Sequence, residues 1–200
     1  SLPRLLDPAH GKGPAEATHD GEVSELDIQG SVFFAEMRRL MQKVEVDFRS
    51  IETVLEVGSG YGRMLQKFRG LFPQAKLYGT DISFRATEQS WRDERTTIVA
   101  DSHIPVSWYR EDYDLIYSVT CLQHVTDETI FTALVQGIKD ALKVGGYLLL
   151  LENTSESKAE HVRCMTREDY QEAFGTGIEW IDASREFWFR EQKHAVMIAK

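Results

Sequence analysis

Short apolar runs alternate with amphipathic stretches between residues 53 and 152, and this alternation constrains the fold more than any other feature of the sequence. The runs are five to seven residues long, and most of them end next to a glycine or an acidic residue. They cover residues 53–57, 75–80, 96–100, 113–119 and 147–152. Parallel strands need crossover connections, usually helices, so the pattern predicts a mostly parallel α/β sheet, doubly wound with helices on both faces.

The amphipathic stretches predict the helices. These are expected at residues 61–71, from Ser83 onward, at 127–142 and at 166–174, with Gly145-Gly146 ending the third. A further helix is predicted from Ile28 to Val46, because its apolar residues recur every three or four positions. Near the C-terminus, residues 178–183 and 195–199 are predicted as two strands of an antiparallel hairpin, joined by residues 185–193.

The N-terminal region differs from the rest in composition. Residues 1–27 hold three of the five prolines and show little periodicity, so they are expected to form an irregular arm. We expect residues 1–46, the arm with its helix, to serve as a lid over a site, and residues 47–200 to form one domain. A length of 200 residues is consistent with a single domain overall.

Charge and composition exclude several classes of function. The 23 basic and 32 acidic residues give a net charge of −9, which disfavours nucleic acid and anionic membranes as partners. The longest apolar run, residues 147–151, is too short to cross a bilayer, and the N-terminal residues show no secretory signal. Two cysteines and no histidine pair with metal-ligand spacing predict a cytoplasmic protein with reduced thiols and no metal.

Glycines and acidic residues gather where the predicted strands end. Ligands of doubly wound sheets bind at the carboxyl ends of the strands, where glycines let the backbone approach them closely. Glu56 and the loop Gly58-Ser59-Gly60-Tyr61-Gly62 follow the first strand, Asp81 ends the second and Asp101 ends the third. An acid after the second strand can accept hydrogen bonds from both ribose hydroxyls, so the pattern indicates an adenosine-containing ligand.

Two other nucleotide-binding motifs fit less well. The dinucleotide fingerprint of NAD enzymes would place its third glycine at position 63, which is Arg63. A phosphate-binding P-loop would end in Gly-Lys-Ser or Gly-Lys-Thr, and the loop after residue 57 does not. An NAD-type oxidoreductase stays as a less favoured alternative.

Five segments, in order, resemble the class I S-adenosylmethionine (SAM)-dependent methyltransferases. They are residues 54–63, 77–83, 98–101, 113–125 and 142–149. The resemblance implies a seven-stranded sheet and SAM as cofactor. The residues that it implies for SAM binding are Glu56, Gly58, Ser59, Gly60, Gly62, Arg63, Asp81, Ile82, Asp101, Ser102, Val119 and Thr120. Among these, Asp81 would bind the ribose, Ile82 would pack on adenine, and Arg63 would meet the methionine carboxylate.

The acceptor side is less constrained by the sequence. His124 follows the fourth strand and is the candidate general base, which is needed only if the acceptor must lose a proton. Candidate acceptor-binding residues are Phe34, Met37, Gln123, His124, Glu152 and Asn153. The loop after the fourth strand lacks the Asn/Asp-Pro-Pro-Tyr/Phe motif of methyltransferases that modify nucleic-acid amines. We therefore expect an O or N atom of a small molecule as acceptor, with a protein N-terminal amine as the alternative and an inactive SAM-binding module as a further one.

Overall fold

A computed structural model describes residues 24–100, 113–156 and 161–200 of the chain. Its centre is a seven-stranded sheet of order β3-β2-β1-β4-β5-β7-β6. The strands are β1 (Thr53–Val57), β2 (Lys76–Asp81), β3 (Thr96–Ala100), β4 (Tyr113–Val119), β5 (Leu142–Asn153), β6 (Arg185–Phe189) and β7 (Gln192–Ala199). Strands β1 to β5 pair in parallel, whereas β7 is antiparallel to both β5 and β6. The predicted fold class is confirmed.

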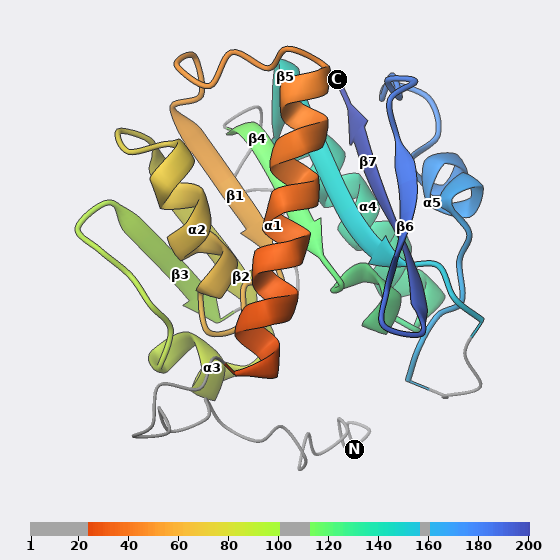
Figure 1. The fold of residues 1–200 in the computed structure, drawn as a ribbon, viewed down its shortest axis with the longest axis horizontal. Helices are drawn as coiled ribbons and strands as arrows, with labels where there is room; N and C mark the ends of the chain where they lie inside the picture. The colour runs from red at the N-terminus through yellow and green to blue at the C-terminus, as the bar shows by residue number, and fades with distance from the viewer. Residues whose placement is uncertain (1–23, 101–112, 157–160) are drawn as a thin grey trace.

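Helices cover both faces of the sheet (Figure 1). They are α1 (Glu25–Lys43), α2 (Arg63–Leu71), α3 (Phe84–Glu88), α4 (Glu128–Ala141) and α5 (Arg167–Phe174), with a short 3-10 turn, η1 (Leu122–His124). One apolar core lies between the sheet and α1 with α2, and a second lies between the sheet and α4 with α5. Among the described helices, none is long and apolar enough to cross a membrane.

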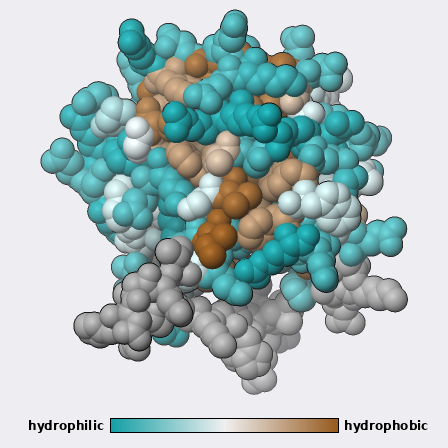
Figure 2. Space-filling view, in the orientation of Figure 1, coloured by the Kyte–Doolittle hydropathy of each residue, from teal (hydrophilic) through white to brown (hydrophobic). Residues whose placement is uncertain are grey.

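Helix α1 is part of the domain core. Its apolar stripe of Phe33, Met37, Leu40 and Met41 is at most 2% exposed and packs over β5 and β7. The helix starts three residues before the predicted Ile28, because the Ser24 side chain accepts a hydrogen bond from the Asp27 N–H and caps it. Figure 2 shows apolar side chains interrupting the polar surface on this face of the molecule. The remainder of the predicted arm, residues 1–23, lies outside the described residues.

The C-terminal hairpin exists, but the prediction placed its first strand wrongly. Residues 178–183 contribute only a single bridge, between Trp180 and Ala199, while β6 lies in the segment predicted as a connection. In β6 the side chains of Phe187 and Phe189 alternate with exposed ones and pack on Phe33 of α1. Pairing with β7 requires the tight turn at Arg190-Glu191, which brings these aromatic residues over the core.

The end of α4 is also different from the prediction. The helix stops at Ala141 and β5 begins at once with Leu142, so Gly145-Gly146 lie inside the strand. The register between β4 and β5 shifts in this stretch, and Gly145 has a φ of 79°. The glycines therefore accommodate an irregular strand start, which is another common use of glycine in sheets.

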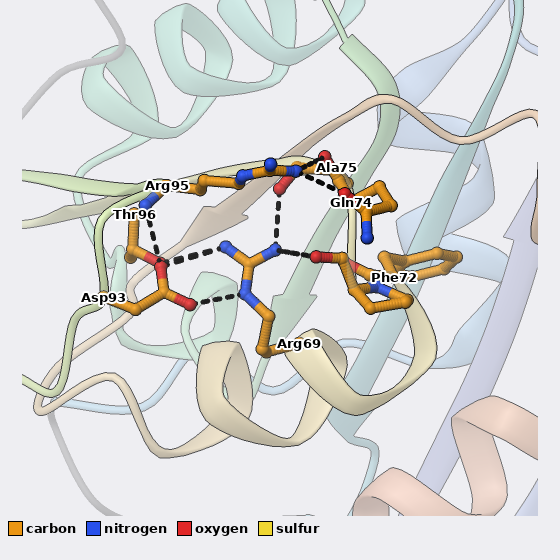
Figure 3. A network of polar contacts seen from close by, with 8 residues as sticks. Arg69, Phe72, Gln74, Ala75, Asp93, Arg95 and Thr96 are labelled. Atoms are coloured by element: carbon orange, nitrogen blue, oxygen red, sulfur yellow. Dashed lines mark hydrogen bonds and ion pairs between the residues drawn. The ribbon is translucent and has the colours of Figure 1, made fainter.

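A polar network fixes the connection between α2 and the β2–β3 edge of the sheet (Figure 3). The Arg69 guanidinium donates to the carbonyl oxygens of Phe72 and Ala75, at 3.1 and 2.7 Å, and pairs with Asp93 at 2.6 Å. Burial raises the pKa of Asp93, but its bonds to Arg69 and Thr96 outweigh this and lower it to about 2. The network holds the helix that follows the glycine loop against the sheet.

Candidate active site

The glycine loop follows β1 at the carboxyl edge of the sheet. Gly58, Gly60 and Gly62 all adopt positive φ values, between 50° and 76°, a region that side-chain-bearing residues disfavour. The N–H groups of Gly58 and Ser59 both donate to the Thr80 carbonyl at 2.8 Å. The loop is therefore tied to the end of β2, and its conformation needs the glycines that the sequence places there.

Asp81 closes the loop from β2. Its Oδ2 accepts the Gly60 N–H at 2.8 Å, and its Oδ1 accepts the Ser83 N–H at 2.8 Å. Ile82, the next residue, is 78% exposed, which leaves an apolar side chain free beside the carboxylate. Among the described residues other than its chain neighbours, Asp81 Oδ2 is the one atom within 4 Å of a Cβ built on Gly60, at 4.0 Å, so these residues leave open space in front of that glycine.

Gly79, inside β2, is a supporting residue that the sequence analysis did not single out. A Cβ at this position would lie 2.6 Å from Ser59 Oγ and 2.9 Å from Leu65 Cδ1. The absence of a side chain thus lets the loop and α2 sit directly on the strand. A glycine inside an otherwise apolar strand was the available signal, since it often marks a close approach.

Glu56 lies beneath the glycine loop and is only 2% exposed. Its carboxylate accepts a hydrogen bond from the Tyr117 hydroxyl at 3.0 Å. Burial raises the pKa of Glu56 well above its usual value, and the Tyr117 hydrogen bond opposes this only in part. A hydrogen bond with the Leu65 backbone in α2 also opposes the shift. Arg63, the first residue of α2, is close enough to favour the charge of Glu56.

The loop after β4 packs against the glycine loop. Thr120 has a φ of 51°, and Cys121 follows it with Sγ only 2.3 Å from where a Gly58 Cβ would lie. Burial raises the pKa of the Cys121 thiol, so it is neutral. Val119 is half-buried and borders the same edge. The two loops, from β1 and β4, therefore form one continuous edge of the sheet.

His124 ends η1 and is exposed. Its Nδ1 lies 3.2 Å from the His161 carbonyl oxygen, which can only accept, so Nδ1 carries the proton. Its Nε2 lies 3.2 Å from Gln123 Nε2 and accepts from that amide. The orientation of the amide is fixed because Gln123 Oε1 accepts the Asn153 N–H at 2.9 Å. These two contacts fit the tautomer with its proton on Nδ1 and its lone pair on Nε2.

Three of the candidate acceptor-binding residues pack against other parts of the protein. Glu152 is fully buried, and its carboxylate oxygens accept hydrogen bonds from Ser118, Leu122 and Gln123, so it presents no free group to an acceptor. Met37 is fully buried in the core under α1. Phe34 packs edge-on against Phe68 of α2, with ring centroids 5.5 Å apart.

The burial of Glu152 and that of Met37 have separate causes. Residue 152 lies one position before the end of β5, where the loop after β4 still covers the strand. Met37 and Phe34 belong to the stripe that seats α1 on the sheet and α2. Gln123 is also buried, at 7% exposure, whereas Asn153 is half-buried and its side chain accepts the Ser155 N–H. The predicted adenine contacts, Asp101 and Ser102, lie outside the described residues. No cluster of three potential metal ligands occurs among the described residues.

Comparisons with known proteins agree with this geometry. A family model described as a methyltransferase domain matches residues 30–192. No curated protein matches the sequence significantly. Among solved structures, a SAM-dependent methyltransferase of Leishmania major is 15% identical, with a TM-score of 0.72, covering 88% of this chain and 74% of that one.

Two further solved structures are N-methyltransferases. The 1,6-didemethyltoxoflavin-N1-methyltransferase of Burkholderia thailandensis, solved with its toxoflavin precursor and S-adenosylhomocysteine, is 18% identical, with a TM-score of 0.63, covering 90% of this chain and 92% of that one. NodS of Bradyrhizobium japonicum is 17% identical, with a TM-score of 0.61, covering 82% of this chain and 94% of that one. At such identities these structures show the shared fold alone.

Proposed function

The chain belongs to the class I SAM-dependent methyltransferases, and we propose that it transfers the methyl group to an O or N atom of a small-molecule acceptor. SAM supplies an electrophilic methyl group when bound, so the protein mainly has to position the acceptor and exclude water. The proposal for the acceptor rests on the residues around the edge that the β1 and β4 loops form.

The chain offers groups of the right chemistry for SAM. Asp81 would accept from the ribose hydroxyls, the exposed Ile82 would cover adenine, and the open space at Gly60 would admit the ligand close to the backbone. Ser59 Oγ is buried and has no hydrogen-bond partner among the described residues, which is the state expected of a group that a ligand would satisfy. Arg63 stays our proposal for the methionine carboxylate.

The observation that carries the proposed acceptor chemistry is the state of His124. It is exposed, its contacts fit a lone pair on Nε2, and it is carried by the same short loop as Cys121, which touches the glycine loop. An acceptor O–H or N–H could replace the Gln123 amide as the donor to Nε2 and then pass its proton there. The Nδ1–H bond to the His161 carbonyl would hold the ring in place during that transfer.

Calorimetry with S-adenosylhomocysteine, followed by transfer assays with methyl-labelled SAM, tests the proposed function. The acceptor panel should contain small amines, phenols and alcohols, together with short peptides that have a free N-terminus. Label on small molecules supports the proposal, whereas label on peptides alone would favour the N-terminal amine alternative. Tight binding of S-adenosylhomocysteine without transfer to any acceptor would indicate a binding module.

A further inference from the structure

Glu152 is a charged side chain for which the proposed function has no use. It is 0% exposed and lies on β5 among the residues that face α4 and α5. A buried carboxylate is costly unless several donors satisfy it, so its partners indicate what it is for. All of these partners come from β4 and the loop that follows it.

The carboxylate makes three hydrogen bonds to that segment. Oε1 accepts from Ser118 Oγ at 2.9 Å and from the Leu122 N–H at 3.2 Å, and Oε2 accepts from the Gln123 N–H at 3.3 Å. An ionised carboxylate offers acceptors only, which matches three donors. A protonated acid would have fewer lone pairs and would add an O–H to this cluster, so the ionised form fits the three donors best.

The loop needs such an anchor because its backbone is strained at its start. Thr120 is β-branched and has a φ of 51°, in the left-handed region that such residues avoid. Strained residues persist only where their surroundings fix them. The Thr120 N–H donates to the Leu151 carbonyl at 2.7 Å, one residue before Glu152, so β5 holds the loop on both sides of the strained position.

The same loop carries the candidate base. Gln123, whose N–H binds Glu152, also receives the Asn153 N–H through Oε1 and donates to His124 through Nε2. Moving Gln123 would therefore release the ring nitrogen of His124 from its present partner. The end of β5 controls this residue through both its backbone and its side chain.

We propose that Glu152 is a positioning residue: its carboxylate holds residues 118–124 in the conformation that carries His124 to the site edge. The inference for catalysis rests on the proposed function, whereas the inference for the loop does not. Because the ionised carboxylate is the stronger acceptor for these three donors, protonation of Glu152 is expected to loosen the loop and reduce methyl transfer.

Electrostatics support a response near neutral pH. Burial raises the pKa of Glu152 to about 7, and the bonds from Ser118, Leu122 and Gln123 oppose this shift. The titratable groups that face it are the Cys121 thiol in the loop and the Tyr170 hydroxyl on α5. Burial raises the pKa of both, so they stay neutral between pH 6 and 8. Among these three groups, therefore, Glu152 is the one whose charge changes between pH 6 and 8.

Hydrogen exchange of residues 118–125, corrected for intrinsic rates, tests the inference between pH 6 and 8. Wild-type protection is expected to fall about tenfold or more toward pH 6, with a midpoint near 7. Glu152→Gln is expected to show low protection throughout, because its amide sets an N–H donor against a backbone N–H. Exposed Glu156→Gln, on the same segment, is the matched control and should behave as wild type.

In Glu152→Gln, we expect activity to fall while thermal stability relative to wild type rises with pH. In Glu152→Gln, kcat is expected to fall roughly 10- to 100-fold, the scale of misplaced catalytic groups, while S-adenosylhomocysteine affinity stays within threefold. The thermal stability of Glu152→Gln relative to wild type should rise as the pH rises toward 7. In this range the unfolded wild-type chain has an ionised Glu152 while the folded protein still holds the proton, so wild type loses stability and the variant does not. Wild-type protection that is flat from pH 6 to 8 would overturn the inference whatever the variant does. Full loop protection in Glu152→Gln would overturn it as well, even if no acceptor has been found.

Discussion

The Gly60 N–H donates to Asp81 Oδ2 at 2.8 Å and so joins the glycine loop of β1 to the last residue of β2. The other oxygen, Oδ1, accepts the Ser83 N–H and caps the turn into α3 at the same time. One carboxylate therefore shapes two loops and still has lone pairs directed to the open edge, since a carboxylate can accept about four hydrogen bonds. Loop geometry and ligand binding depend on the same residue.

Replacing Asp81 should therefore weaken SAM binding. Asp81→Ala removes the acceptor of the Gly60 amide and the acceptor that we propose for the ribose, and each unpaired group costs about 1–3 kcal/mol. Affinity for S-adenosylhomocysteine is expected to fall by about 5- to 150-fold, measured by calorimetry. Asp140→Asn on α4, whose carboxylate accepts a hydrogen bond from the Gln136 side chain, is the control. Unchanged affinity in Asp81→Ala would disprove the assignment.

A methyl group at Gly79 should disturb the same site from inside the sheet. The new Cβ would lie 2.6 Å from Ser59 Oγ, so the glycine loop or β2 must shift. Gly79→Ala is expected to lower the free energy of unfolding by about 1–3 kcal/mol and to weaken S-adenosylhomocysteine binding. Urea unfolding and calorimetry measure the two effects.

Gly70→Ala provides the matched control for Gly79→Ala. Gly70 lies inside α2 with nothing within 4 Å of its added Cβ. Alanine there should raise stability by about 0.5–1 kcal/mol, because glycine is a poor helix former. Equal effects of the two substitutions would show that Gly79 has no special role.

The parallel part of the fold could be predicted because its signals are local. The apolar run 53–57 and the glycines after it gave β1 and its loop with the observed bounds, and Ser83 gave the start of α3. The hairpin could not be placed in this way, since β6 mixes exposed polar residues with Phe187 and Phe189. Their inward direction depends on β7 and α1, which the local pattern does not contain.

Part of the candidate site could also be predicted because its sequence signals are local. Asp81 and the glycines occupy strand ends, which a sequence reveals directly. The role of Glu152 depends on Leu122 and Gln123, about 30 residues earlier in the chain, and only folding brings them together. A polar residue at a strand end therefore resembled a ligand-binding group, although its partners are a hydroxyl and two backbone amides of this protein.

His194 should make stability depend on pH. It is buried against Phe33, with ring centroids 4.8 Å apart, and burial lowers its pKa, although its bond to the Gln192 carbonyl opposes this. The unfolded chain takes up a proton near pH 6.5 while the folded protein resists it. The stability present above pH 6.5 is therefore lost as the pH falls, by at most about 1.4 kcal/mol per pH unit.

Urea unfolding of wild type and His194→Phe from pH 5 to 8 measures this contribution. The variant should gain stability relative to wild type as the pH falls below 6.5, because phenylalanine has no proton to exclude. His161→Ala, which removes an exposed imidazole, should show no such trend. A difference between wild type and His194→Phe that is constant with pH would contradict the argument.

His124→Ala should separate proton transfer from cofactor binding. If the acceptor must lose a proton, removing a positioned base lowers turnover by about 10²- to 10⁴-fold. Affinity for S-adenosylhomocysteine should stay within a few-fold, because the described cofactor-side groups do not hydrogen-bond to His124. Asp140→Asn on α4 is the control, since its carboxylate accepts from Gln136 and not from His124. Single-turnover rates with saturating SAM give the comparison. A small loss of rate in His124→Ala together with a large loss of affinity would assign His124 a structural role and leave methyl transfer to proximity alone.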